Sequence, residues 1–174
     1  MKKIIVGLFI ITFFVSCNTL DKLTQFDINV SENVIIKPTL PINVPFDIPT
    51  PPIKLNTEQS FENNNTHKDL IQEISVSKLT MSVQLPEGED FSMLKSIDIY
   101  IETDDETDEK IAWLQPVPSA SVIDLEISNN DLKKIIMKDK ITLKVKTITD
   151  EINTREYKIK IDAQFRVNAR ILGI

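Results

Sequence analysis

Strict alternation of apolar and polar residues marks the C-terminal part of the chain. Apolar side chains occupy every second position from Tyr157 to Ile171, and polar side chains lie between them. Helical neighbours recur at three and four residues, whereas a strand sends alternate side chains to opposite faces. The pattern therefore predicts a long strand with one buried face. A shorter alternation from Ile141 to Val145 precedes it, and the polar segment 149–154 between the two indicates an antiparallel hairpin.

A second long strand is predicted from Leu70 to Leu85. Its apolar positions change parity near Ser77 and Lys78. A strand cannot move its apolar side chains to the other face without an inserted residue, so we expect a β-bulge there. Further strands are predicted at 26–30, continued at 34–37 after a turn at 31–33, and at 97–101, 110–114 and 122–127, with 97–101 and 110–114 paired as a hairpin.

A proline-rich segment lies between the first and second long stretches, with six prolines from Pro38 to Pro52. Proline cannot donate a hydrogen bond to a neighbouring strand, which predicts extended chain at a sheet edge or crossing between sheets. Apolar residues still alternate between the prolines. This alternation favours packing against the protein's own core over presentation as a proline-rich ligand.

Helical signals are sparse. The polar segment Thr57–Asp69 contains three consecutive asparagines and is predicted to be a loop, and residues 91–95 are predicted to form a single helical turn. Leu132, Ile135 and Ile136 follow several candidate N-cap residues at 128–131. They predict the one helix of the chain, two to three turns long, covering one end of the domain.

These elements together predict an all-β fold, a two-sheet antiparallel β-sandwich with one short helix. The strand pattern is immunoglobulin-like, and the order of elements is also similar to the late-embryogenesis-abundant type of sandwich. A chain of 174 residues suits one such domain, which we assign to residues 26–174. Its three glycines form no phosphate-binding cluster, which excludes Rossmann and P-loop interpretations.

The N-terminus has the features of an export signal. Two lysines precede an apolar run of twelve residues, Ile4 to Val15, which is too short to cross a bilayer that needs about 20. It therefore predicts a signal peptide. The run is followed by Ser16 and by Cys17, the only cysteine of the chain. Disulfides are thereby excluded.

This arrangement resembles the lipobox of bacterial lipoproteins, and the composition is similar to small Bacteroidetes envelope lipoproteins. The resemblance implies that residues 1–16 are a lipoprotein signal peptide, that Cys17 is acylated and becomes the first residue, and that 17–25 form a lipidated tether. Two or three acyl chains would hold the protein firmly on a membrane. The alternative is a cleaved signal with an incidental cysteine.

The resemblance also predicts the location. Asn18 stands where an aspartate retains enterobacterial lipoproteins at the inner membrane, which implies the outer membrane here. Surface-exported Bacteroidetes lipoproteins often have an acidic cluster directly after the cysteine, and none follows Cys17. We therefore expect a lipid anchor on the periplasmic face.

Charge is uneven along the chain. Without Lys2 and Lys3 the mature chain has 18 basic and 26 acidic residues, a net charge of −8, yet the segment from Lys140 onward is +4. Six basic residues there fall on the polar faces of the last two predicted strands: Lys144, Lys146, Lys158, Lys160, Arg166 and Arg170. Like charges on neighbouring strands are unfavourable, so we expect them to be compensated.

Two kinds of compensation are open. Acidic residues from another segment would neutralise the stripe, or it would contact an anionic partner such as lipid head groups, an anionic glycan or an acidic envelope protein. Nucleic acid is excluded as a partner by the acidic net charge and by export.

Catalytic and metal chemistry have little support. His67 is the only histidine, and no spacing of ligands suits zinc. The segment Glu102–Glu109 has six carboxylates in eight residues, but no glycine allows the sharp turn of an EF-hand loop, so a solvated hairpin tip is predicted. We expect no cofactor, no metal and no enzymatic activity.

The sequence thus predicts a membrane-anchored envelope lipoprotein that acts as a non-catalytic binding or structural module. One alternative is a carbohydrate-active or hydrolytic accessory protein, which needs paired carboxylates such as Asp98 and Asp124. Another is a subunit of a surface or secretion assembly, which would exchange its proline-rich segment between molecules.

Overall fold

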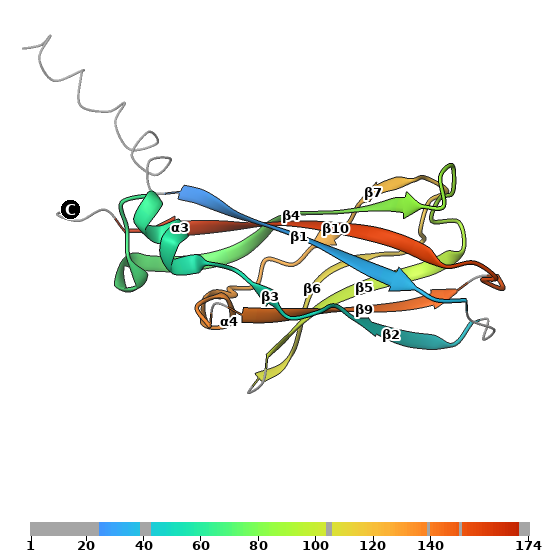
Figure 1. The fold of residues 1–174 in the computed structure, drawn as a ribbon. Coiled ribbons are helices and arrows are strands. Elements are labelled where there is room, and N and C mark those ends of the chain that lie inside the picture. Colours follow the sequence, from blue (N-terminus) through green and yellow to red (C-terminus); the bar gives the residue numbers. More distant parts are fainter. Residues whose placement is uncertain (1–24, 39–42, 104–105, 139, 150, 171–174) are drawn as a thin grey trace, which may run out of the picture.

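The computed structural model describes residues 25–38, 43–103, 106–138, 140–149 and 151–170. These residues form ten strands and two short α-helices (Figure 1). The strands are β1 (Gln25–Ile36), β2 (Pro45–Pro49), β3 (Ile53–Lys54), β4 (Ile71–Leu85), β5 (Leu94–Thr103), β6 (Glu106–Leu114), β7 (Val122–Asp124), β8 (Glu126–Ile127), β9 (Lys140–Thr149) and β10 (Tyr157–Ala169). The helices are α3 (Thr57–Asn63) and α4 (Lys133–Ile136), and a 3₁₀ turn spans Lys68–Leu70.

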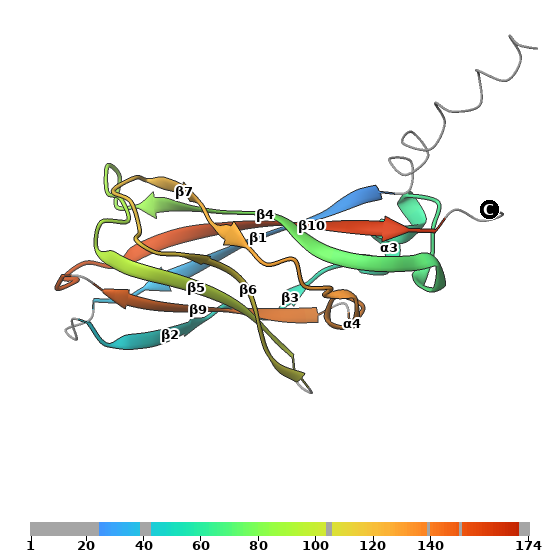
Figure 2. The same ribbon diagram turned by 180° about the vertical axis from the view of Figure 1, so that it is seen from behind.

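The strands form two layers (Figures 1 and 2). One sheet has the order β1-β10-β4-β7, and we call it the β10 sheet. The other has the order β2-β9-β5-β6-β8, with β3 also paired to β9, and we call it the β9 sheet. All strand pairings are antiparallel. The predicted two-sheet antiparallel β-sandwich is confirmed.

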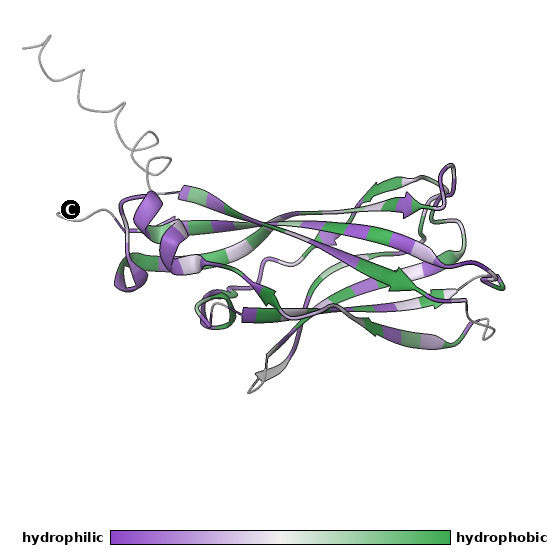
Figure 3. Cartoon of the chain, in the orientation of Figure 1, coloured by the Kyte–Doolittle hydropathy of each residue, from purple (hydrophilic) through white to green (hydrophobic). Residues whose placement is uncertain are grey.

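Strand β10 is the centre of its sheet. It pairs along its length with β1 on one side and with β4 on the other. Every second side chain from Tyr157 to Ala169 is buried, and the residues between them are exposed or half-buried. The predicted alternation is therefore confirmed up to Ala169, and Ile171 lies outside the described residues. Figure 3 shows the same alternation as hydrophobic and hydrophilic bands.

The predicted bulge in β4 is also confirmed. Gln164 of β10 lies opposite Lys78, but the next residue, Phe165, lies opposite Val76. Ser77 is thus the extra residue, and its hydroxyl donates a hydrogen bond to the Gln164 carbonyl at 3.2 Å. The inserted residue returns the apolar side chains of β4 to the buried face on both sides of the bulge.

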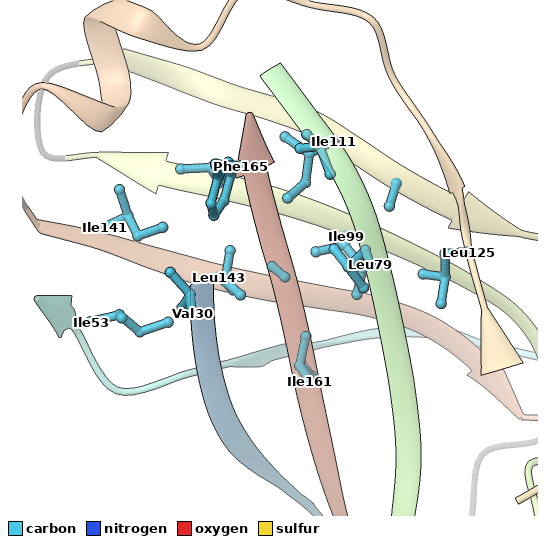
Figure 4. Packing of buried hydrophobic residues seen from close by; sticks show 14 of the residues in the cluster. Val30, Ile53, Leu79, Ile99, Ile111, Leu125, Ile141, Leu143, Ile161 and Phe165 are labelled. Carbon is cyan, nitrogen blue, oxygen red and sulfur yellow. The ribbon is translucent and has the colours of Figure 1, made fainter. Parts of the chain in front are cut away.

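The hydrophobic core lies between the two sheets (Figure 4). Phe165, Leu79 and Ile161 of the β10 sheet face Leu143 and Ile99 of the β9 sheet, and all five are at most 1% exposed. Burying one such side chain contributes about 1.5–3 kcal/mol relative to exposure. The tight burial of both inner faces explains why the apolar positions alternate so regularly in the sequence.

The predicted hairpin between the last two long strands is wrong. β9 and β10 belong to opposite sheets, so the segment between Thr149 and Tyr157 crosses from one layer to the other. Asn153 in this crossing is buried, and its amide nitrogen donates to the Lys37 carbonyl at 3.2 Å. A polar segment between two strands shows that the chain turns, but it does not determine which sheet the next strand joins.

Strand β1 is continuous, so the predicted turn at 31–33 is wrong. Its residues pair with β10 without interruption from Gln25 to Ile36. Glu32 lies opposite the buried Ile161 and therefore on the core side of this edge strand. Its carboxylate accepts a hydrogen bond from the Asn33 backbone N–H at 2.7 Å. An inward-facing charge on an edge strand opposes pairing with another chain.

The predicted strand at 122–127 is divided between the two sheets. β7 pairs with β4, and β8 pairs with β6. Between them the Leu125 N–H donates to the Leu79 carbonyl at 2.9 Å. Ile123 and Leu125 are buried as predicted, and Ile127 is half-buried. This short crossing closes one side of the sandwich.

The prediction of a loop at 57–69 is wrong, because α3 and the 3₁₀ turn lie there. Thr57 and Phe61, one helical turn apart, are both buried, and the Phe61 ring makes an edge contact with Phe26 at 6.0 Å between centroids. Asn65 has a φ of 54° and donates to the Glu62 carbonyl, while the Thr66 N–H reaches Phe61. This is a Schellman ending, in which asparagine tolerates the left-handed conformation.

Helix α4 is confirmed but has a single turn, shorter than predicted. Leu132, Ile135 and Ile136 are buried as expected. Asp131 Oδ1 accepts hydrogen bonds from the N–H of Lys133 at 2.9 Å and from the N–H of Ile74 at 3.1 Å, which ties the helix start to β4. The predicted helical turn at 91–95 is a simple turn, because β5 already begins at Leu94.

The proline-rich segment lies at a sheet edge, as predicted. β2 pairs with β9 at the edge of its sheet, and Phe46 and Ile48 pack partly against the core. Thr50 continues the contact, because its N–H donates to the Leu143 carbonyl at 2.7 Å and its hydroxyl accepts from the Leu143 N–H at 2.9 Å. Residues 39–42, including Ile42, lie outside the described residues.

Truncation of the central core residue tests this packing. Phe165→Ala should lower the free energy of unfolding by about 3–5 kcal/mol, because it removes a fully buried ring. Urea denaturation followed by Trp113 fluorescence measures the change. Lys158→Ala in the same strand removes an exposed side chain and should change stability by less than about 0.5 kcal/mol. Equal losses for both variants would contradict the assignment of faces.

Glu32 provides a test of edge protection. Glu32→Val should give concentration-dependent oligomers, because it leaves the inner face of this edge strand entirely apolar, without its inward-facing charge. Size-exclusion chromatography with light scattering measures the oligomeric state. Glu32→Lys keeps a charge at the same position and should behave as the wild-type protein does. A Glu32→Val protein that matches the wild type at every concentration would refute the role assigned to Glu32.

Candidate functional site

The two ends of the sandwich differ in character. β1 begins at Gln25 at the end where β10 finishes, and α3 also lies there; we call this the near end (Figure 1). At the opposite end, which we call the far end, β1 and β4 finish and β10 begins. The crossing from β9 to β10 also lies at the far end.

Exposed apolar side chains gather at the far end. Among the described residues, the large hydrophobic side chains that are exposed are Ile35, Val44, Leu85, Val122 and Ile152, each with 49–59% exposure. They come from the end of β1, the residue before β2, the end of β4, the start of β7 and the β9–β10 crossing. Single exposed apolar residues are ordinary, but a concentration of them indicates an interaction surface.

Three of these residues lie on the outer face of the β10 sheet. Ile35 and Leu85 lie opposite Lys158 on its two sides, which forms the cross-strand row Ile35–Lys158–Leu85. Val122 lies opposite Ser82, one row further along. Directly opposed side chains have Cβ atoms about 4.5–5.5 Å apart. Lys158 therefore lies between two exposed apolar side chains.

The far-end loops are held by contacts around Glu89. Its carboxylate pairs with Arg155 and accepts a hydrogen bond from the Tyr157 hydroxyl at 3.0 Å. Burial of Tyr157, together with this hydrogen bond and the Glu89 charge, raises the pKa of its phenol. The backbone turn before Glu89 uses Gly88 at a φ of 80°. These contacts join the β4–β5 loop to the start of β10.

A shallow cavity of about 460 Å³ opens beside these loops. Its lining includes Glu87, Glu89 and Asp90 from the β4–β5 loop and Ser119 and Ser121 from the segment before β7. Hydrogen bonds from Ser92 lower the pKa of Asp90. Within the ranges that the structure describes, no group of three or more histidine, cysteine or acidic residues is arranged to hold a metal ion.

The predicted basic stripe is divided between two surfaces. We expected Lys144 and Lys146 on a strand beside the other four residues. This prediction is wrong, because β9 lies in the opposite sheet. Lys144 is held by Glu102 at 2.5 Å and by Asp108, and these contacts raise the pKa of its ammonium group. Lys146 lies over the ring of Tyr100, with Nζ 5.5 Å from the centroid. Both cations are thus engaged within the chain.

The four basic residues of β10 differ in their partners. Arg166 Nε donates to Asp27 at 2.9 Å, and this contact raises the pKa of Arg166. Lys160 pairs with Asp162 at 2.7 Å. The pKa of Asp162 lies below its ordinary value. Burial alone would raise this pKa, but the hydrogen bonds from Lys160 and Ser31 have the larger combined effect and lower it.

Lys158 and Arg170 are the exceptions. Both are exposed, and neither side chain forms an ion pair with another residue in the described part of the chain. The backbone N–H of Arg170 donates to the Leu70 carbonyl at 2.7 Å, and the residues after it lie outside the described ranges. Neutralisation by acidic neighbours therefore accounts for Lys144, Lys160 and Arg166, but not for Lys158 or Arg170.

The outer face of the β9 sheet holds two aromatic residues that our sequence analysis missed. Tyr100 and Trp113 point outward from β5 and β6 and are half-buried. Lys110 Nζ lies 5.4 Å from the Trp113 ring centroid and 2.5 Å from Asp98. Tyr100 lies between the buried Ile99 and Ile101, and Trp113 directly follows the buried Ala112. This alternation was the signal in the sequence that both rings face outward.

Three residues of the acidic segment 102–109 form contacts within the chain. Glu102 and Asp108 hold Lys144, and Glu109 accepts a hydrogen bond from the Asn130 amide. These three residues therefore have polar partners within the chain, while the predicted solvated tip itself stays a prediction. The side chains of 103–107 lie outside the described part of the structure.

The structure separates the carboxylates considered for catalysis. Asp98 is in the β9 sheet and pairs with Lys110, whereas Asp124 is in β7 of the β10 sheet. Asp124 accepts a hydrogen bond from Thr80 Oγ1 at 2.5 Å and lies 3.5 Å from Lys78 Nζ. The two carboxylates do not share a cleft. His67 is exposed at the start of the 3₁₀ turn.

No protein-family model matches the chain, and no curated protein matches it significantly. In the ranges described here, no helix is long and apolar enough to span a membrane. Cys17 and the tether up to residue 24 lie outside the described residues.

The Tyr157 contact gives a pH test. The difference between the alkaline absorbance titrations of the wild type and Tyr157→Phe should give a Tyr157 midpoint above 10.0. The folded state favours the neutral phenol, so its stabilising effect is present below pH about 10 and is lost as the pH rises through the higher folded pKa. Glu89→Gln should lower the midpoint only in part, because burial remains. A wild-type midpoint at or below 10 would contradict this contact.

Proposed function

We propose that this protein is an envelope lipoprotein, anchored by acylated Cys17 to the periplasmic face of the outer membrane, whose sandwich acts as a non-catalytic binding or structural module. The observation that carries the proposal is the concentration of exposed apolar side chains at the far end. A protein that only had to fold would gain nothing from exposing them together.

The position of the tether agrees with this function. The seven residues between Cys17 and Gln25 reach at most about 25 Å, and they enter the sandwich at the near end. The twelve residues of β1 then extend for about 40 Å to the far end. The anchor would thus hold one end of the domain near the bilayer and leave the other available to envelope components.

The alternatives receive less support. A hydrolytic accessory protein would require carboxylates that face a common substrate, and Asp98 and Asp124 lie on opposite sheets, each beside a lysine. An assembly subunit that exchanges its proline-rich segment would need that segment to leave its own fold, and β2 pairs with β9 of the same chain. A binding module needs neither feature.

Acylation at Cys17 tests the anchor directly. In a bacterial host that processes lipoproteins, the wild-type chain should incorporate an alkyne-bearing palmitate and sediment with membranes. Cys17→Ser removes the thiol that would carry the lipid and should abolish both labelling and the mobility shift of the mature form. An unlabelled wild-type chain, or a Cys17→Ser chain that is still labelled, would refute the lipoprotein proposal.

A further inference from the structure

We infer that the cross-strand row Ile35–Lys158–Leu85 is a docking site for a second envelope protein, which places a carboxylate on Lys158 between two apolar contacts. The inference rests on the proposed function, because it requires the protein to reside in the envelope. It names the partner's chemistry and the residues that meet it.

The geometry supplies both parts of such a site. Lys158 lies near the start of β10, with Ile35 of β1 and Leu85 of β4 directly opposite it. The two apolar side chains are 49% and 53% exposed, so they remain available for contact. In protein interfaces, contacts that exclude water surround the few residues that carry most of the binding free energy.

Charge complementarity favours a carboxylate. The neighbouring cations on this face already have acidic partners, since Lys160 pairs with Asp162 and Arg166 with Asp27. Lys158 has no ion pair with a described residue of its own chain. A partner carboxylate would complete the same cation–carboxylate pattern and would also help to select the correct partner.

The position of the row favours a protein over a lipid surface. Lipid head groups are recognised by clusters of several unpaired basic residues, with about 1 kcal/mol contributed by each. This row offers one such cation, and it lies about 33 Å along β1 from the point where the tether enters. A sheet face with two exposed apolar residues beside one cation suits a protein surface.

Zero-length carbodiimide coupling tests the contact. The reagent activates a carboxylate, and the attacking Lys158 amine forms an amide with net loss of one water, which the reagent takes up as a urea. Membranes containing the full acylated protein would be treated, and linked peptides identified by mass spectrometry. The intramolecular pair Lys144 and Glu102, 2.5 Å apart, is the internal control for coupling.

The expected result is a link between Lys158 and an aspartate or glutamate of another protein. Lys158→Arg keeps the charge but cannot form the amide, so it should lose the link and still co-purify the partner without reagent. Lys158→Glu should lower co-purification at least about tenfold. Lysine placed at the mapped partner carboxylate should restore co-purification with Lys158→Glu.

Three results would overturn the inference. The first is a Lys144 link without any Lys158 link to a protein, which is the result that a lipid surface would give. The second is a Lys158 link only to a second copy of this chain, and the third is co-purification that Lys158→Glu does not change. Palmitate labelling of the same membranes separates the two proposals. An acylated protein without the Lys158 link contradicts only the docking site, whereas an unlabelled protein contradicts the lipoprotein proposal.

Discussion

Burial of one face of β10 between two partner strands is the constraint on which the rest of the structure depends. β10 pairs with β1 and β4 along its length, so both neighbours take their register from it. Its buried residues face the β9 sheet and form much of the core. The same register places Ile35 and Leu85 beside Lys158, so the core packing and the far-end surface have a common origin.

The parts of the fold that could be predicted depend on parity along single strands. Alternation identified β10, and the parity change in β4 located the bulge at Ser77 because a buried face tolerates no slip. The partnership of β9 could not be predicted, because a turn constrains only neighbouring residues whereas β5 and β2 decide which sheet β9 joins. α3 was missed because its stability comes from the contact of Phe61 with Phe26, which are distant in sequence.

The candidate site, too, could be predicted from the sequence only in part. The sequence identified Lys158 as one of six similar basic residues, since composition and alternation place them all on polar faces. The distinction between them depends on cross-strand register and on sheet membership. Lys144 meets Glu102 and Asp108 because β9 lies beside β5 and close to β6, and Arg166 meets Asp27 because β1 pairs with β10. These neighbours are separated by between 36 and 139 residues in the chain.

The far end also differs from the remainder of the surface in what it contributes to stability. Ion pairs on the outer faces are in contact with water, and each contributes little to the free energy of folding. Their main effect is that the paired side chains are not available to bind another molecule. Lys158 keeps its charge available, and exposed Ile35 and Leu85 contribute little to folding because water still contacts about half of each side chain. Replacement of Ile35 and Leu85 by polar residues would cost the fold little. The folding of this chain therefore does not explain why two apolar side chains are exposed beside Lys158.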